Sequence, residues 1–118
     1  MSIASLNRSP FALTESDWSR RVVDCARLFR WRYYHARPAR TTRGWVTAMS
    51  GDRGWPDLVL LRPPRLILAE LKSDTGQPTP EQSDWIAELS MVPGVETYVW
   101  RPRDWETVYM TLARESHP

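Results

Sequence analysis

Cysteine, histidine and lysine are scarce in this chain of 118 residues, which contains one cysteine, two histidines and one lysine. One cysteine cannot form an internal disulfide, and with only two histidines it cannot supply the usual structural zinc sites, so we expect a reducing, cytoplasmic environment and no zinc. No apolar run reaches membrane-spanning length, and the first ten residues lack the apolar core of a signal peptide. These absences favour an intracellular globular protein.

The length and composition predict a single domain. Hydrophobic residues make up 42% of the chain, which is enough for one core at this length. Residues 1–13 show no periodicity and contain Pro10, so we expect a flexible arm there. Residues 14–118 are expected to form the domain, and no internal repeat or low-complexity segment divides them.

The basic residues are almost all arginine and are unevenly distributed. Residues 1–53 hold ten arginines and four acidic residues, a balance of +6, whereas residues 54–118 have a balance of −4. Arginine grips phosphate through its planar guanidinium group, so the first half could face a nucleic acid. A solvated arginine-rich surface, or the codon bias of a GC-rich genome, would give the same composition.

The segment 54–72 predicts a hairpin of two strands. Leu58–Leu61 and Leu66–Leu71 are apolar runs of strand length, and the Arg62-Pro63-Pro64-Arg65 sequence between them is a turn that no helix could cross. Side chains alternate along a strand, so Glu70 and Lys72 should project from one face while Ala69 and Leu71 project from the other into apolar packing.

This hairpin brings two carboxylates together. Asp57 stands at the start of the first strand, and pairing through the turn places it close to Glu70. Two carboxylates at the edge of an apolar sheet repel each other unless a cation lies between them. Oxygen ligands of this kind suit Mg²⁺ or Mn²⁺, so the hairpin predicts a metal site.

The pattern Pro56-Asp57 followed by Glu70-Leu71-Lys72 resembles the signature of the PD-(D/E)XK nuclease superfamily. Together with Gly54-Trp55, Gln82 and the Trp100-Arg101-Pro102 stretch, it is similar to the free-standing VRR-NUC branch from about Thr14 to Ala113. The resemblance implies a metal-dependent, structure-selective DNA endonuclease that acts on branched DNA such as Holliday junctions and works as a homodimer. The alternative is a catalytically silent nucleic-acid-binding module with the same fold.

The resemblance also assigns roles to individual residues. Asp57 and Glu70 would bind Mg²⁺ or Mn²⁺, with the Leu71 backbone carbonyl as a further ligand and Glu15 joining directly or through water. Lys72 would orient the nucleophile or stabilise the developing negative charge, and the sequence does not separate these two roles.

Three candidate site residues have a second explanation each. Glu15 could be a first-turn acid that complements the helix dipole, although we favour the metal site for it. Gln82 could complete a capping box with Thr79, or point towards the Glu70 strand, or do both. His35 could be an ordinary surface residue or a phosphate contact.

The connection 36–53 has no clear period and leads directly into Asp57. Long irregular connections in compact domains are usually functional or disordered, so we interpret this one as a DNA-contacting flap. Its candidate phosphate contacts are Arg37, Arg40, Arg43 and Arg53. Trp45 could stack on a base or pack against the core.

The remaining periodicities complete an α/β fold. Thr14 can cap a helix whose apolar side contains Trp18, Val22, Cys25 and Phe29, with Cys25 as a buried hydrophobic residue. A strand is expected at 31–35, a helix after Thr79, a strand at 95–100 and a helix from Asp104. The expected order is αβββαβα, a mixed central sheet flanked by helices. The seven tryptophans exceed what a small core readily hides, which favours a dimer interface.

Overall fold

The computed structural model of the chain describes residues 13–36, 39–41, 44–46 and 50–115. The described elements are α2 (Glu15–Leu28), β1 (Arg32–His35), β2 (Ala39–Thr41), β3 (Gly44–Val46), β4 (Leu58–Arg62), β5 (Arg65–Leu71), α3 (Pro80–Leu89), β6 (Val95–Trp100), the 3₁₀ turn η1 (Pro102–Asp104) and α4 (Trp105–Ala113). In the part of the chain that the structure describes, no helix has the length and apolar character needed to cross a membrane.

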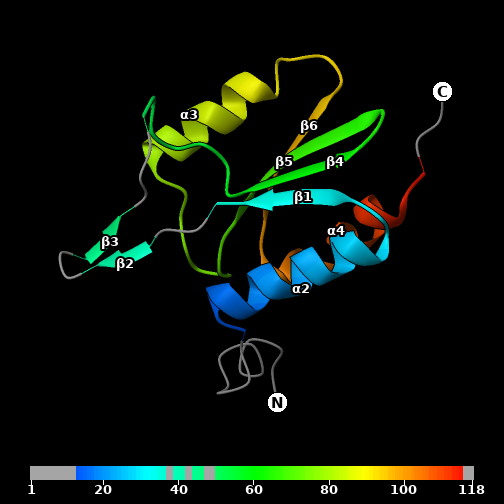
Figure 1. Cartoon of the computed structure of the whole chain (residues 1–118), viewed down its shortest axis with the longest axis horizontal. Helices are drawn as coiled ribbons and strands as arrows, with labels where there is room; N and C mark the ends of the chain where they lie inside the picture. The colour runs from blue at the N-terminus through cyan, green and yellow to red at the C-terminus, as the bar shows by residue number, and fades with distance from the viewer. Residues whose placement is uncertain (1–12, 37–38, 42–43, 47–49, 116–118) are drawn as a thin grey trace.

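The central feature is a mixed four-stranded sheet in the order β1-β4-β5-β6. β1 pairs with β4 and β4 pairs with β5 in antiparallel fashion, whereas β5 and β6 are parallel. The parallel pair requires a crossover, and α3 supplies it between β5 and β6. The expected α/β class with a mixed sheet between helices is therefore confirmed (Figure 1).

The helices lie on both faces of this sheet. Figure 1 shows α2 and α4 on one side and α3 on the other. The α2/α4 face carries the main core, in which Trp18, Val22, Val108 and Leu112 are fully buried with Leu58, Leu60, Ile67, Ala69 and Leu71 of the sheet. Cys25 is buried here as expected, and burial raises the pKa of its thiol.

The expected helices and the four strands of the main sheet are present, the strands within one residue of the expected bounds, and one prediction needs correction. The 36–53 connection was expected to lack regular structure, but it contains the antiparallel hairpin β2–β3, which stands apart from the main sheet (Figure 1). Three-residue strands are too short to show the period of two in the sequence. The expected core order αβββαβα holds when this hairpin is treated as an insertion between β1 and β4.

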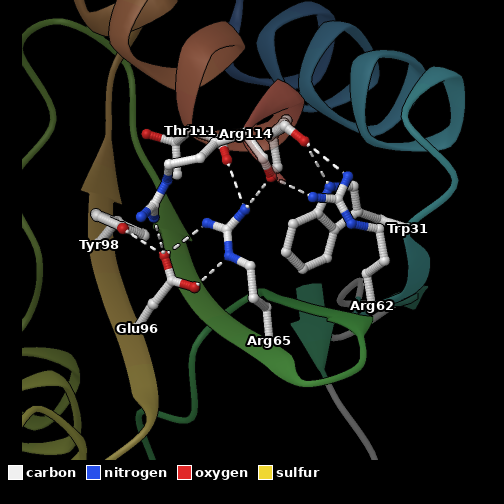
Figure 2. Close-up of polar contacts among 8 residues, drawn as sticks. Trp31, Arg62, Arg65, Glu96, Tyr98, Thr111 and Arg114 are labelled. Atoms are coloured by element: carbon white, nitrogen blue, oxygen red, sulfur yellow. Dashed lines mark hydrogen bonds and ion pairs between the residues drawn. The ribbon is translucent and has the colours of Figure 1, made fainter. Parts of the chain in front are cut away.

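A buried arginine cluster fastens the beginning of β5 to α4 (Figure 2). Arg65 donates two hydrogen bonds to the Glu96 carboxylate, both 2.7 Å long, and one each to the carbonyls of Thr111 and Arg114. Arg62 donates to the carbonyls of Phe29, Leu112 and Arg114, and Trp31 Nε1 also donates to Leu112. These side chains satisfy carbonyls that the end of a helix leaves unpaired.

Candidate metal site

Glu70, near the end of β5, carries a fully buried carboxyl group. Its side chain is 0% exposed, and neither Oε1 nor Oε2 accepts a hydrogen bond from any described residue. A buried polar group left without a hydrogen bond costs about 1–3 kcal/mol, and an ionised carboxylate costs more. Such a buried carboxylate is stable only when a nearby cation or a bound proton compensates its charge.

Asp57 lies directly before β4 and faces Glu70. Leu58 is opposite Ala69 in the β4–β5 register, so Asp57 and Glu70 are brought together as the hairpin predicted. Asp57 Oδ2 accepts a hydrogen bond of 3.0 Å from the backbone N–H of Leu71, which holds the carboxylate at the end of the strand. Burial first, and the neighbouring Asp57 carboxylate second, raise the pKa of Glu70 to about 8.

Lys72 is the cationic member of the group. Its Nζ lies 3.6 Å from Glu70 Oε1, and its side chain is only 14% exposed. This charge lowers the pKa of Glu70, against the larger effects of burial and Asp57. The Lys72 backbone N–H donates to the carbonyl of Trp100, which also accepts from Trp18 Nε1, so β5 is tied at this point to β6 and α2.

The loop that carries Asp57 rests on the first turns of α3. Gly54 has a φ of +104°, and a Cβ there would lie 2.5 Å from the backbone carbon of Glu81, so the close approach requires glycine. The Arg53 carbonyl accepts from Trp85 Nε1, and the rings of Trp55 and Trp85 meet edge to face. These contacts fix the position of Asp57 relative to α3.

Two carboxylates converge at this site. Among the described residues, no group of three or more His, Cys, Asp or Glu side chains could hold a metal ion. The buried oxygens of Glu70, which accept no hydrogen bond from the described residues, and the oxygens of Asp57 fit a divalent cation such as Mg²⁺ or Mn²⁺, which often keeps several waters as ligands. The amide of Leu71 is used by Asp57. The role of the Leu71 carbonyl as a ligand stays a prediction.

Glu15 and Gln82 occupy the expected elements. Glu15 is the exposed first residue of α2, in a turn that Thr14 caps, and no three-acid group forms around it within the described residues. Gln82 completes the capping box of α3: its Oε1 accepts from the Thr79 N–H, and its own N–H donates to Thr79 Oγ1. The dipole and capping interpretations are therefore satisfied, and the metal-site roles of both residues stay predictions.

His35 lies on the other face of the sheet from Glu70. It is opposite Leu58, a core residue of the α2 face, and it lines a cavity of about 390 Å³ together with Arg20, Arg27 and Tyr33. The structure does not bring it onto the Asp57–Glu70 face. A phosphate contact by His35 would require the substrate to extend around the edge strand β1.

The candidate arginines of the flap are only partly placed. Arg37 and Arg43 lie outside the described residues, and Arg40 is in β2 opposite Trp45, with neither side chain described. Arg53 is exposed beside a cavity of about 620 Å³ whose lining includes four carboxylates, those of Asp52, Glu81, Asp84 and Glu88. The negative charge of these acids disfavours a phosphate at Arg53. The sequence did not reveal this acidic group, because its members come from two separate segments.

Sequence reasoning missed the residues that support the site. The packing of Gly54 against α3 and the bond from Trp85 to Arg53 were not foreseen, and neither was the clamp in which Arg101 donates to the carbonyls of Ser73 and Gly76 after Lys72. The one available signal was glycine directly before a Trp-Pro-Asp sequence, since a glycine often marks close backbone approach.

Comparison with known proteins adds no relative: no family model, no curated protein and no solved structure matches the chain.

Proposed function

We propose that this chain is a metal-dependent DNA endonuclease of the PD-(D/E)XK type, similar to the VRR-NUC branch, that cleaves branched DNA such as Holliday junctions. One observation carries the proposal: the carboxyl group of Glu70 is fully buried beside Asp57, accepts no hydrogen bond from the described residues, and has only the Lys72 ammonium, 3.6 Å away, as an ion-pair partner among them. A buried carboxyl group with a raised pKa, beside a second carboxylate and a lysine, is an arrangement found at catalytic sites.

The chemistry follows from the donor set. A divalent cation bound there would lower the pKa of a water ligand and neutralise charge on the scissile phosphate. Asp57 and Glu70 provide the oxygens that hold it, and the Leu71 amide fixes Asp57 in place. Lys72 places a positive charge at the same point, where it can orient the attacking water or stabilise the negative charge that develops on the phosphate.

A catalytically silent nucleic-acid-binding module is the second candidate. It is favoured by the same Lys72, because a lysine beside Glu70 compensates part of the charge without any metal, and a pKa of about 8 lets the carboxyl hold a proton at neutral pH. A calorimetric titration with Mn²⁺ distinguishes the two, since the silent module predicts no heat of binding.

Cleavage of a panel of four-way junctions, flaps, single strands and linear duplexes in Mg²⁺ or Mn²⁺ tests the activity. We expect Asp57→Asn, Glu70→Gln and Lys72→Met each to lower nicking by orders of magnitude while circular dichroism stays native. Glu106→Gln, which changes an exposed acid of α4 below the other face of the sheet, is the matched control and should cleave normally. Normal turnover of the Glu70→Gln protein would contradict the proposal.

The homodimer is part of the same proposal, because a two-fold symmetric junction requires two cuts and each chain carries one candidate site. Most of the described tryptophans are buried or half-buried within the single chain, so they give less support to a dimer interface than the sequence suggested. Of the six described tryptophans, Trp18, Trp31 and Trp100 are buried, Trp85 and Trp105 are half-buried, and Trp55 is 40% exposed. Light scattering tests the expected mass of two chains, and mixed dimers of wild-type and Glu70→Ala chains should nick only one strand of a junction.

A further inference from the structure

The α3 face of the sheet is covered unevenly. α3 packs over β6, which is at the opposite edge from β1 in the order β1-β4-β5-β6. On the β1 side the ring of Tyr34 is 64% exposed, Arg32 is exposed and Leu61 is 38% exposed. This open surface, defined by Arg32, Tyr34 and Leu61, is an aromatic and cationic patch on the sheet.

The open surface is on the same face as the candidate metal site. Tyr33 and His35 line a cavity with Arg20 and Arg27 of α2, so alternation turns Arg32 and Tyr34 to the opposite side. Leu58 belongs to the α2 core, so Asp57 and Val59 also face the α3 side. Asp57, Glu70 and Tyr34 therefore lie on the same face of the sheet, where Glu70 is buried and Tyr34 is exposed.

The strand register gives the separation. Tyr34 is opposite Val59, which is two residues after Asp57. Two strand residues span about 6.6 Å, and neighbouring strands lie about 4.8 Å apart. The ring of Tyr34 is thus within reach of a nucleotide whose phosphate is held at the metal site, and Arg32 is a further two residues along the same strand.

We propose that Tyr34 stacks on an unpaired base next to the scissile phosphate and that Arg32 contacts the backbone beyond it. The proposal rests on the proposed nuclease function and specifies its substrate as DNA with a single-stranded segment at the cut. An exposed ring on a flat sheet offers a face to any unstacked base, whereas paired bases in a duplex hide their faces from it.

The pair Tyr33 and Tyr34 provides an internal control, because they are adjacent, both exposed to solvent (43% and 64%), and directed to opposite faces. The probe is a single-stranded oligonucleotide with 2-aminopurine, bound in Ca²⁺ to prevent cleavage. We expect Tyr34→Ala to weaken binding about 5- to 150-fold, the effect of removing one stacked base contact. Tyr34→Phe should bind like wild type, Tyr33→Ala should remain within about twofold of it, and a duplex of the same sequence should not respond to Tyr34→Ala.

The outcomes separate this proposal from the nuclease proposal. If binding depends on Tyr34 but no DNA is cleaved in Mg²⁺ or Mn²⁺, the stacking site stands and the nuclease function fails. If wild type cleaves and Tyr34→Ala binds and cleaves like it, the stacking site is overturned and the nuclease stands. Equal losses in Tyr33→Ala and Tyr34→Ala, no binding of the probe by wild type, or a change of Tyr34→Ala from dimer to monomer without a change in affinity would each overturn it.

Discussion

Each end of β5 buries an ionisable side chain, and the two side chains differ in their hydrogen bonding. At the start of the strand Arg65 is 7% exposed, and its guanidinium makes four hydrogen bonds, two of them to Glu96 (Figure 2). Five residues later Glu70 is 0% exposed and accepts none from the described residues. One end is a completed ionic network, and the other is an incomplete one.

This difference teaches where stability and function reside in the strand. A buried charge whose hydrogen bonds are all made holds elements together, whereas a buried ionised group that lacks hydrogen bonds costs free energy that folding alone does not recover. The pKa shifts have opposite signs accordingly. Arg65 lowers the pKa of Glu96, mainly through its hydrogen bonds, while burial and Asp57 raise the pKa of Glu70 to about 8.

The largest expected effect is a pH dependence of opposite sign at the two ends. The folded pKa of Glu70 is above the unfolded value of about 4.3, so the folded state holds more protons between these values, and the free energy of unfolding falls as pH rises towards 8. The slope from this group approaches about 1.4 kcal/mol per pH unit. Glu96 has a pKa lowered by its hydrogen bonds with Arg65, so its contribution is lost only as pH falls below the pKa of an unfolded glutamate.

Urea unfolding in EDTA from pH 5 to 8 measures this dependence. Glu70→Gln should remove most of the slope and be more stable than wild type at pH 8, whereas Glu96→Gln should keep the slope. An unchanged slope in Glu70→Gln would mean that Glu70 does not titrate in this range.

Removing Arg65 from the completed network at the start of β5 should also destabilise the protein. Arg65→Met leaves Glu96 without its bidentate partner and unpairs the carbonyls of Thr111 and Arg114, so we expect a loss of about 3 kcal/mol. The double variant Arg65→Met with Glu96→Leu should recover part of that loss. Metal binding and cleavage, measured below the melting temperature, should stay normal; a loss of metal affinity would show that the two ends are coupled.

Binding of a metal ion at the Glu70 end of β5 should stabilise the folded protein. Mn²⁺ at 100 times its dissociation constant should add about 2.7 kcal/mol to the free energy of unfolding, because only the folded state brings Asp57 and Glu70 together. Differential scanning calorimetry at pH 8 should show a rise of several °C for wild type and none for Glu70→Gln. A rise of equal size in both proteins would place the metal elsewhere.

The smallest expected effect comes from Tyr98, whose hydroxyl donates a 2.8 Å hydrogen bond to Glu96 Oε1. Tyr98→Phe removes this bond and retains the ring stacked on Trp100, so a loss of about 1 kcal/mol is expected. Thermal unfolding measures it. A loss as large as that of Arg65→Met would contradict this order, because the hydroxyl would then contribute as much as the guanidinium.

The hairpin and its carboxylates could be predicted because they depend on local rules. Alternation along β5 and the Pro-Pro turn are enough to bring Asp57 to Glu70. The N-caps Thr14 and Thr79 could also be predicted from the sequence. Alternation also predicted that Ala69 and Leu71 pack in the core. It did not predict that Glu70 is buried as well, since the cover over that face comes from segments distant in sequence.

The rest could not be predicted because it depends on tertiary approach. The partners of Arg65 are at positions 96, 111 and 114, and nothing in the turn sequence indicates them. The contact of Gly54 with Glu81 joins two segments in different elements. The placement of His35 on the α2 face, by contrast, follows from the β1–β4 register, which the apolar pattern alone did not fix.

The arginine cluster also has a consequence for folding during protein synthesis. Arg62 and Arg65 leave the ribosome long before residues 111–114, whose carbonyls they bind in the folded protein. Until those residues emerge, the β4–β5 hairpin cannot bury its two guanidinium groups without leaving their donors unpaired. We therefore expect this hairpin to stay hydrated on the nascent chain, and the domain to close only after residues 111–114 have emerged.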